Sequence, residues 1–167
     1  MNVRVGLGYD VHPFATDGSG RTLVLGGVTI PDCVGLVGHS DADAVAHAVA
    51  DSLLGPSGLD DLGTLFPAGD DRYRNANSME LLDRVVAKVW AQGWGLSNVD
   101  IVIAAERPRL APFVGEMRTR LTTALAPLAV DQSDVFVSVT AKRGEGIGSI
   151  GRGEGIEVRA VALLTRR

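Results

Sequence analysis

A chain of 167 residues with 46% hydrophobic and 22% charged residues has the size and composition of one compact domain, so we expect a single domain over residues 1–167. The single cysteine excludes an intrachain disulfide, and the short apolar runs and missing signal-peptide pattern predict a cytoplasmic protein with no membrane partner. The net charge of −4 divides into −8 over residues 1–71 and +4 over residues 72–167, and this acidic first half argues against a nucleic-acid partner.

Two strands are predicted near the start of the chain. Apolar residues alternate over residues 3–9, which is the two-residue period of a strand. A second strand is predicted over residues 22–30. We expect a bend or bulge where Gly26-Gly27 interrupts it, and we expect Pro31 to end it.

Two helices are predicted next. Ser40 is a plausible N-cap of the first, whose apolar stripe ends at Gly55-Pro56. Asn77 and Glu80 resemble a capping box at the start of the second helix, which is predicted to stop at Gly93.

The remaining chain is predicted to hold a third helix over residues 112–125 and strands over 99–103, 135–139 and 156–164. A glycine-rich segment, residues 144–155, separates the last two strands. Strands mixed with three helices predict an α+β fold. We expect a two-layer α/β sandwich, with a mixed β-sheet and helices packed on one of its faces.

Aspartate and histidine are concentrated in the first half of the chain. Its acidic residues are all aspartates, and the three histidines, His12, His39 and His47, lie among them. Short carboxylates mixed with imidazoles suit a metal or phosphate site. In a strand, Asp10 and His12 point to the same side and converge, although a capping aspartate beside a surface histidine gives the same pattern.

A second cluster is predicted on the first helix. Asp43, His47 and Asp51 recur every four residues, which describes either a solvated polar face or a histidine ligand supported by carboxylates. We favour the ligand, because each of the few histidines lies near an aspartate. Asp10, His12 and His47 then supply three ligands and leave a fourth position open, which is the pattern of a catalytic zinc site.

Two groups of loops also contain candidate residues. Residues 58–63 and 66–71 have the composition of turn-rich surface loops. Residues 142–145 and 151–155 combine glycines with lysine and arginine, so they describe either a phosphate-binding segment or a flexible hairpin loop. Their spacing fits neither a Walker loop nor a dinucleotide fingerprint.

A series of motifs extends over nearly the whole chain: Gly8-Tyr9-Asp10-Val11-His12, Leu25 to Pro31, Gly38 to Asp43, His47-Ala48, Asp51 to Gly55, Gly58 to Gly63, Phe66-Pro67 and Gly151 to Ile156. In these motifs and their order, the chain resembles the 2-C-methyl-D-erythritol 2,4-cyclodiphosphate synthase family. The resemblance implies a phosphorus–oxygen lyase of non-mevalonate isoprenoid biosynthesis. Its substrate is 4-diphosphocytidyl-2-C-methyl-D-erythritol 2-phosphate, whose 2-phosphate attacks the β-phosphate and releases CMP.

The same resemblance implies ligands for two metal ions. One zinc ion per subunit is implied at Asp10, His12 and His47. A second divalent ion, Mg²⁺ or Mn²⁺, is implied at Glu145, where it meets the diphosphate.

It also implies catalytic roles for His39 and Arg143, at positions that stabilise the transition state. The positions implied to contact the substrate are Asp10, Val11, His12, His39, Ser40, Asp61, Leu62, Gly63, Phe66, Asp70, Ala105, Pro108, Arg109, Leu110, Ala111, Lys142, Arg143, Gly144, Glu145 and Arg152.

The family forms homotrimers whose active sites lie between subunits. By resemblance, Arg152 and Glu154 surround the trimer axis, where some members bind an isoprenoid diphosphate. The opposite charges of the two halves of the chain agree with a contact between subunits.

The chain departs from the family at Lys142-Arg143-Gly144, where threonines are usual. It also departs at Ala68, Arg109 and Ser149, which replace an aspartate, a lysine and a frequently aromatic residue. Two alternatives therefore remain: a trimeric metal- and nucleotide-binding module with impaired synthase activity, and a zinc phosphohydrolase in which water attacks. The synthase yields CMP and a cyclic product, the hydrolase yields open-chain phosphates, and the module yields neither.

Overall fold

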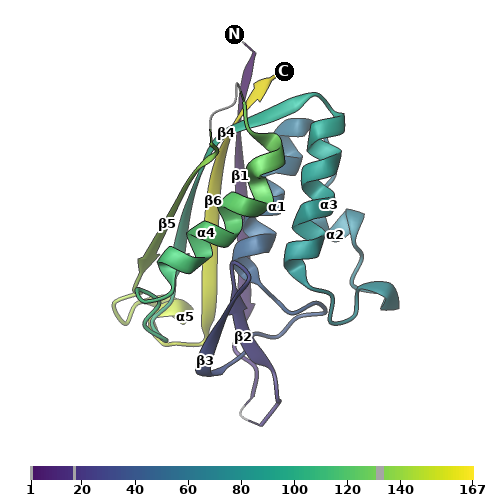
Figure 1. The fold of residues 1–167 in the computed structure, drawn as a ribbon. Coiled ribbons are helices and arrows are strands. Elements are labelled where there is room, and N and C mark those ends of the chain that lie inside the picture. The colour runs from purple at the N-terminus through teal and green to yellow at the C-terminus, as the bar shows by residue number, and fades with distance from the viewer. Residues whose placement is uncertain (1, 17, 131–133) are drawn as a thin grey trace.

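The computed structural model describes residues 2–16, 18–130 and 134–167, and its centre is a four-stranded mixed sheet (Figure 1). All neighbouring strands are antiparallel except β4 and β5, which are parallel. In spatial order, the strands are β1 (Val3–Pro13), β6 (Gly155–Arg166), β4 (Trp94–Ala104) and β5 (Phe136–Lys142). The strands predicted over 99–103 and 156–164 are therefore confirmed as parts of longer strands, and the one predicted over 135–139 begins one residue later.

The helices cover one face of this sheet, as Figure 1 shows, which confirms the predicted α+β sandwich. The three long helices are α1 (Ala44–Ser57), α3 (Ser78–Ala91) and α4 (Val114–Leu125). The shorter ones are α2 (Leu62–Leu65), η1 (Asp71–Tyr73), η2 (Ala126–Leu128) and α5 (Gly148–Gly151). One apolar cluster fills the space between the helices and the sheet. Among the described residues, no helix is long and apolar enough to span a membrane.

Helix α1 packs directly on the backbone of β1 because two glycines face it. A Cβ at Gly8 would lie 1.8 Å from the Ala48 carbonyl oxygen, and one at Gly6 would lie 2.0 Å from the Ser52 carbonyl oxygen. Real Cβ atoms do not approach backbone so closely, so only glycine permits this distance between strand and helix. Asp10 follows on the same side of β1, at the end of this contact.

The helices of the described residues leave the opposite face of the sheet uncovered (Figure 1). The apolar residues of β1 point to this side, because its buried glycines point to α1. The alternation over residues 3–9 thus predicts the strand correctly, yet its apolar side chains are outside the core. The large apolar side chains exposed on this face include Val3, Val5, Leu7, Tyr9 and Val11 of β1, Val102 of β4 and Val161 of β6.

The segment predicted as one strand over residues 22–30 is a hairpin of β2 (Thr22–Leu25) and β3 (Val28–Val34). Gly26 and Gly27 form its turn with φ of 57° and 74°, and two residues with positive φ are what a tight two-residue hairpin turn requires. Pro31 does not end the strand but lies inside β3, at an irregularity where the register shifts and residues 31–33 have no paired residue in β2.

The predicted ends of two helices also need correction. The N-cap of α1 is Asp43 rather than Ser40, and Gly55-Pro56 lies within its last turn, while Gly58 supplies the left-handed C-cap. Pro112 lies before α4 instead of in its first turn. The predicted N-cap of α3, Asn77, is confirmed and accepts a hydrogen bond from the Met79 N–H at 2.9 Å.

Candidate metal centre and adjoining pockets

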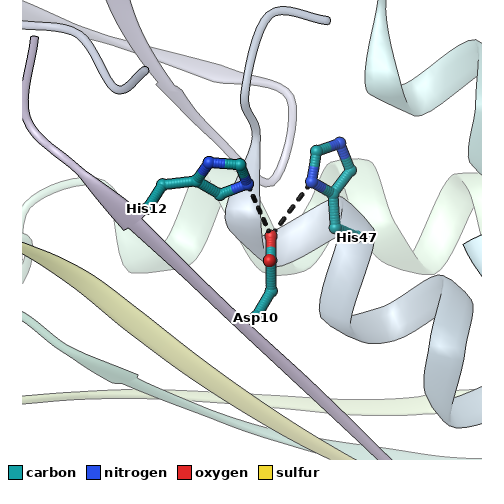
Figure 2. A group of neighbouring side chains, drawn as sticks. All are labelled: Asp10, His12 and His47. Atoms are coloured by element: carbon teal, nitrogen blue, oxygen red, sulfur yellow. Dashed lines mark hydrogen bonds and ion pairs between the residues drawn. The ribbon is translucent and has the colours of Figure 1, made fainter. Parts of the chain in front are cut away.

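The structure brings Asp10, His12 and His47 together at the point where β1 meets α1 (Figure 2). Asp10 Oδ2 lies 3.0 Å from His12 Nε2 and 3.0 Å from His47 Nδ1. One potential ligand atom from each residue lies within 4.8 Å of the other two. The geometry therefore agrees with the pairing of the Asp10-Val11-His12 motif with the helical histidine, and we call these three residues the triad.

Hydrogen bonding prepares His12 as a ligand. Its Nδ1 lies 2.7 Å from the Val37 carbonyl oxygen, which can only accept, so Nδ1 carries a proton and Nε2 is the nitrogen that can bind a metal once it gives up the proton shared with Asp10. Burial alone would raise the pKa of Asp10, but hydrogen bonds and charge interactions with the two histidines lower it to about 2. The hydrogen bond to Asp10 raises the pKa of His12 against the effect of burial. A metal ion therefore meets an ionised carboxylate and displaces a proton from His12.

This donor set fits a zinc ion. Two imidazole nitrogens and one carboxylate oxygen are zinc ligands of the usual kind, and the triad is half-buried and opens onto a pocket. The other carboxylates of the predicted helix face serve elsewhere. Asp43 is fully buried and accepts backbone N–H groups, including that of Gly26, while Asp51 accepts the Leu62 N–H at 2.8 Å.

A pocket of about 280 Å³, which we call the triad pocket, lies beside these ligands. It gathers seven positions that the sequence implied as substrate contacts, namely Asp10, His12, His39, Ser40, Leu62, Gly63 and Phe66. His47, Asp51, Ala68, Tyr73 and Leu81 complete its lining. His39 Nε2 lies 3.1 Å from the Asp70 carbonyl oxygen, which ties the loop after α2 to the pocket.

A second pocket, of about 400 Å³, lies where β4 and β5 end; we call it the β4–β5 pocket. Its lining unites implied substrate contacts from residues 105–111 with two from residues 142–145: Ala105, Pro108, Arg109, Leu110, Ala111, Lys142 and Arg143, together with Glu106 and Ala141. The Arg143 guanidinium donates to Glu106 Oε1, and the Gly144 N–H donates to Glu106 Oε2 at 3.1 Å. The hydrogen bond between Arg143 and Glu106 lowers the pKa of the Glu106 carboxyl and raises the pKa of the Arg143 guanidinium.

Several implied site residues line neither pocket. Gly144, Glu145 and Arg152 belong to the glycine-rich segment, and Arg152 pairs with Glu154 at 2.6 Å. Val11 points to the uncovered side of the sheet. The Asp61 side chain caps α2 by accepting the Thr64 N–H at 2.7 Å.

Some contacts of the site were not selected from the sequence. The Val37 carbonyl carries no sequence signal, because any residue supplies a carbonyl. Neither Ser78 nor Glu106 is among the residues predicted from the sequence, although Glu106 lies between the predicted substrate contacts Ala105 and Pro108. Their roles depend on contacts between residues 31 to 38 positions apart, which no local pattern reports.

The fold and the triad define a two-layer α+β protein with a three-ligand metal site between a strand and a helix. Comparison with known proteins identifies the family of the chain. The chain belongs to the YgbB family, whose model matches residues 3–165.

Individual relatives match over their full length. The chain is 50% identical to 2-C-methyl-D-erythritol 2,4-cyclodiphosphate synthase of Moorella thermoacetica, over 99% of this chain and 96% of the relative. It is 51% identical to the enzyme of the same name from Rubrobacter xylanophilus, over 98% and 95%. Among solved structures, the CDP complex of Plasmodium falciparum IspF has a TM-score of 0.81 and 33% identity, over 99% of this chain and 97% of that one.

Proposed function

We propose that the chain converts 4-diphosphocytidyl-2-C-methyl-D-erythritol 2-phosphate into 2-C-methyl-D-erythritol 2,4-cyclodiphosphate and CMP. The observation that carries this proposal is the triad, which is intact in a chain about half identical to enzymes named for the product. The reaction joins two anionic phosphate groups of one substrate, so the site has to bring them together and stabilise the charge that develops.

The triad pocket supplies the groups for the phosphate end of the substrate. A zinc ion held by the triad would polarise the β-phosphate, and this is the chemistry that the metal contributes. The Ser40 hydroxyl lines the same pocket, where it can donate a hydrogen bond to a phosphate oxygen, and the His39 imidazole lies beside it. Leu62, Gly63 and Phe66 also line this pocket and give it an apolar surface, which suits the carbon chain of the erythritol.

The β4–β5 pocket is proposed to hold the cytidine diphosphate part. Arg143 and Lys142 bring positive charge to its lining, and Pro108 and Leu110 bring apolar surface. The P. falciparum structure named as a CDP complex supports a nucleotide ligand for this fold. Glu145 is proposed to hold a second divalent ion, Mg²⁺ or Mn²⁺, beside the diphosphate.

The synthase assignment is tested by identifying the products. The purified protein, supplied with zinc and magnesium, is expected to release CMP and the cyclic diphosphate from the substrate in equal amounts, which phosphorus NMR measures. Open-chain phosphates in place of the cyclic product would instead identify a zinc phosphohydrolase. Binding of CDP without any turnover would identify a metal- and nucleotide-binding module.

We further propose that the active protein is a homotrimer in the cytoplasm. The uncovered sheet face exposes Leu7 at 67% and Val5 at 69% of their surfaces, beside Tyr9 and Val161. A contiguous apolar face of this kind is typical of an interface between subunits. Such an assembly would let the triad pocket of one subunit meet residues 142–145 of another. Arg152 would then lie near the trimer axis, which is proposed to bind an isoprenoid diphosphate.

Light scattering is expected to give a mass three times the 17.5 kDa of one chain. Leu7→Asp places a charge on the uncovered sheet face and is expected to shift the protein to monomers with little activity. Trp90→Asp, which changes an exposed apolar residue of α3, is the matched control and is expected to remain trimeric. A fully active monomer would contradict the proposed assembly.

Arg143→Thr is expected to weaken CDP binding and to lower turnover together, because it removes a cation from the β4–β5 pocket. The CDP affinity of the wild-type protein should fall with added salt more steeply than that of the variant, as calorimetry measures. Arg120→Thr, on the outer surface of α4, is the matched control. Higher turnover in Arg143→Thr at unchanged CDP affinity would show that the arginine does not assist catalysis.

Gly144→Thr, which would bring back a second threonine of the family pattern, cannot be combined with Arg143→Thr in this test. A Cβ at Gly144 would lie 2.5 Å from the Gly151 backbone nitrogen, so any larger residue displaces the end of α5. The glycine at this departure from the family pattern is therefore required by the loop itself.

A further inference from the structure

The second ring nitrogen of His47 belongs to a half-buried chain of hydrogen bonds. His47 Nε2 lies 2.9 Å from Ser78 Oγ, and the Ser78 hydroxyl donates to Asp41 Oδ1. The Ser78 N–H also donates to Asp41 Oδ2, at 3.1 Å. Ser78 is the first residue of α3, is 1% exposed and does not line the triad pocket, so its hydroxyl is out of the substrate's reach.

The carboxylate gives this chain its direction. Asp41 accepts from Ser78 at both carboxylate oxygens, so Ser78 commits its one hydroxyl proton to Asp41 and offers a lone pair to His47. The Nε2 of His47 then carries a proton and donates it to Ser78 Oγ. The lone pair is left on Nδ1, the nitrogen that lies 3.0 Å from Asp10 Oδ2 in the triad.

Ser40 cannot replace Ser78 in this arrangement. Its Oγ lies 3.2 Å from His47 Nε2, which is farther than Ser78 Oγ, and it accepts the Ala42 N–H at 3.1 Å. Ser40 also lines the triad pocket, where the proposed reaction gives it a phosphate to bind. The buried hydroxyl of Ser78 is free of that second task.

We propose that Ser78, oriented by Asp41, is a positioning residue that fixes the tautomer and ring orientation of His47 for metal binding. With its Nε2 edge held by Ser78 Oγ, the His47 ring turns Nδ1 toward Asp10 Oδ2, where a metal ion held by the triad would bind. The inference rests on the proposed metal site, and it extends that site from β1 and α1 to the start of α3.

Zinc affinity of the metal-free protein, measured by competition with a chelating dye, tests the proposal without turnover. Ser78→Ala is expected to weaken zinc binding about 10- to 100-fold, the usual effect of removing a partner behind a histidine ligand. Ser57→Ala is the matched control, because it deletes a buried helix hydroxyl that contacts only the Leu53 carbonyl. Ser78→Thr retains the hydroxyl and is expected to recover most of the affinity.

A spectroscopic measurement separates positioning from a loss of packing. In the zinc-loaded protein, the His47 Nε2 proton is expected to give a slowly exchanging NMR signal, which should be absent in Ser78→Ala and present in Ser78→Thr. Equal zinc affinity for wild type and Ser78→Ala overturns this inference alone, and so does a fast-exchanging wild-type proton. A wild-type protein that binds no zinc overturns the proposed metal site together with it.

Discussion

His47→Ala is expected to reduce bound zinc to a small fraction of one ion per chain and to lower turnover by about 10³-fold or more. The variant lacks one of the three protein ligands, and a polarising metal contributes several kcal/mol to a phosphoryl-transfer barrier, with each 1.4 kcal/mol worth about tenfold in rate. Elemental analysis of the dialysed protein and a CMP-release assay measure the two effects.

A pair of carboxylate variants controls for the loss of charge. Asp10→Asn keeps the size of the ligand but removes its charge, so it is expected to lose zinc as His47→Ala does. Asp71→Asn removes an equivalent charge from a side chain that is 82% exposed outside the triad pocket, and it should bind zinc normally. Undiminished zinc occupancy in His47→Ala would exclude the triad as the metal site.

Asp43→Ala is expected to destabilise the fold by about 3 kcal/mol or more, which lowers the midpoint of thermal unfolding by about 10 °C. Asp43 Oδ1 accepts the N–H groups of Gly26, Val45 and Ala46 at 2.8 to 3.0 Å, and its Oδ2 accepts that of Gly27 at 2.7 Å. The side chain is fully buried, so its removal leaves N–H groups of both the hairpin turn and α1 without their acceptor.

Asn77→Ala is the matched control for helix capping alone. Its side chain caps α3 through one hydrogen bond, and its loss is expected to cost about 1 kcal/mol. Equal losses for the two variants would show that the contacts of Asp43 with the hairpin turn add nothing to stability. Calorimetric unfolding of the metal-free proteins provides both values without interference from bound zinc.

The contrast between these two caps shows what a sequence can predict. Asn77 was identified because its single partner lies two residues away, within the window that a capping pattern describes. The prediction of Ser40 as the cap of α1 is wrong, because the Ser40 hydroxyl contacts His47 and Ser78 instead. The observed cap, Asp43, also accepts a hydrogen bond from the hairpin turn, 16 residues before it. Contacts over such separations leave no periodic trace.

The candidate site also has features that the sequence predicts and features that it does not. The side chains of Asp10 and His12 converge as the two-residue period of a strand requires, and His47 was found by its spacing from aspartates on a helix. The sequence could not show that the apolar residues of β1 face away from the core, because alternation alone does not say which side is covered. That choice follows from the glycines, which let α1 cover one side.

The contact between β1 and α1 has a consequence for the tolerance of the metal centre to mutation. Gly6 and Gly8 never touch the metal, yet they set how far the backbone carrying Asp10 stands from the backbone carrying His47. A methyl group at either position pushes the helix outward and separates ligand atoms that are now 3.0 Å apart. Substitution of Gly6 or Gly8 is therefore restricted by the distance between the metal ligands as well as by packing. Such a substitution can disturb the metal centre although it leaves all three ligand residues in the sequence.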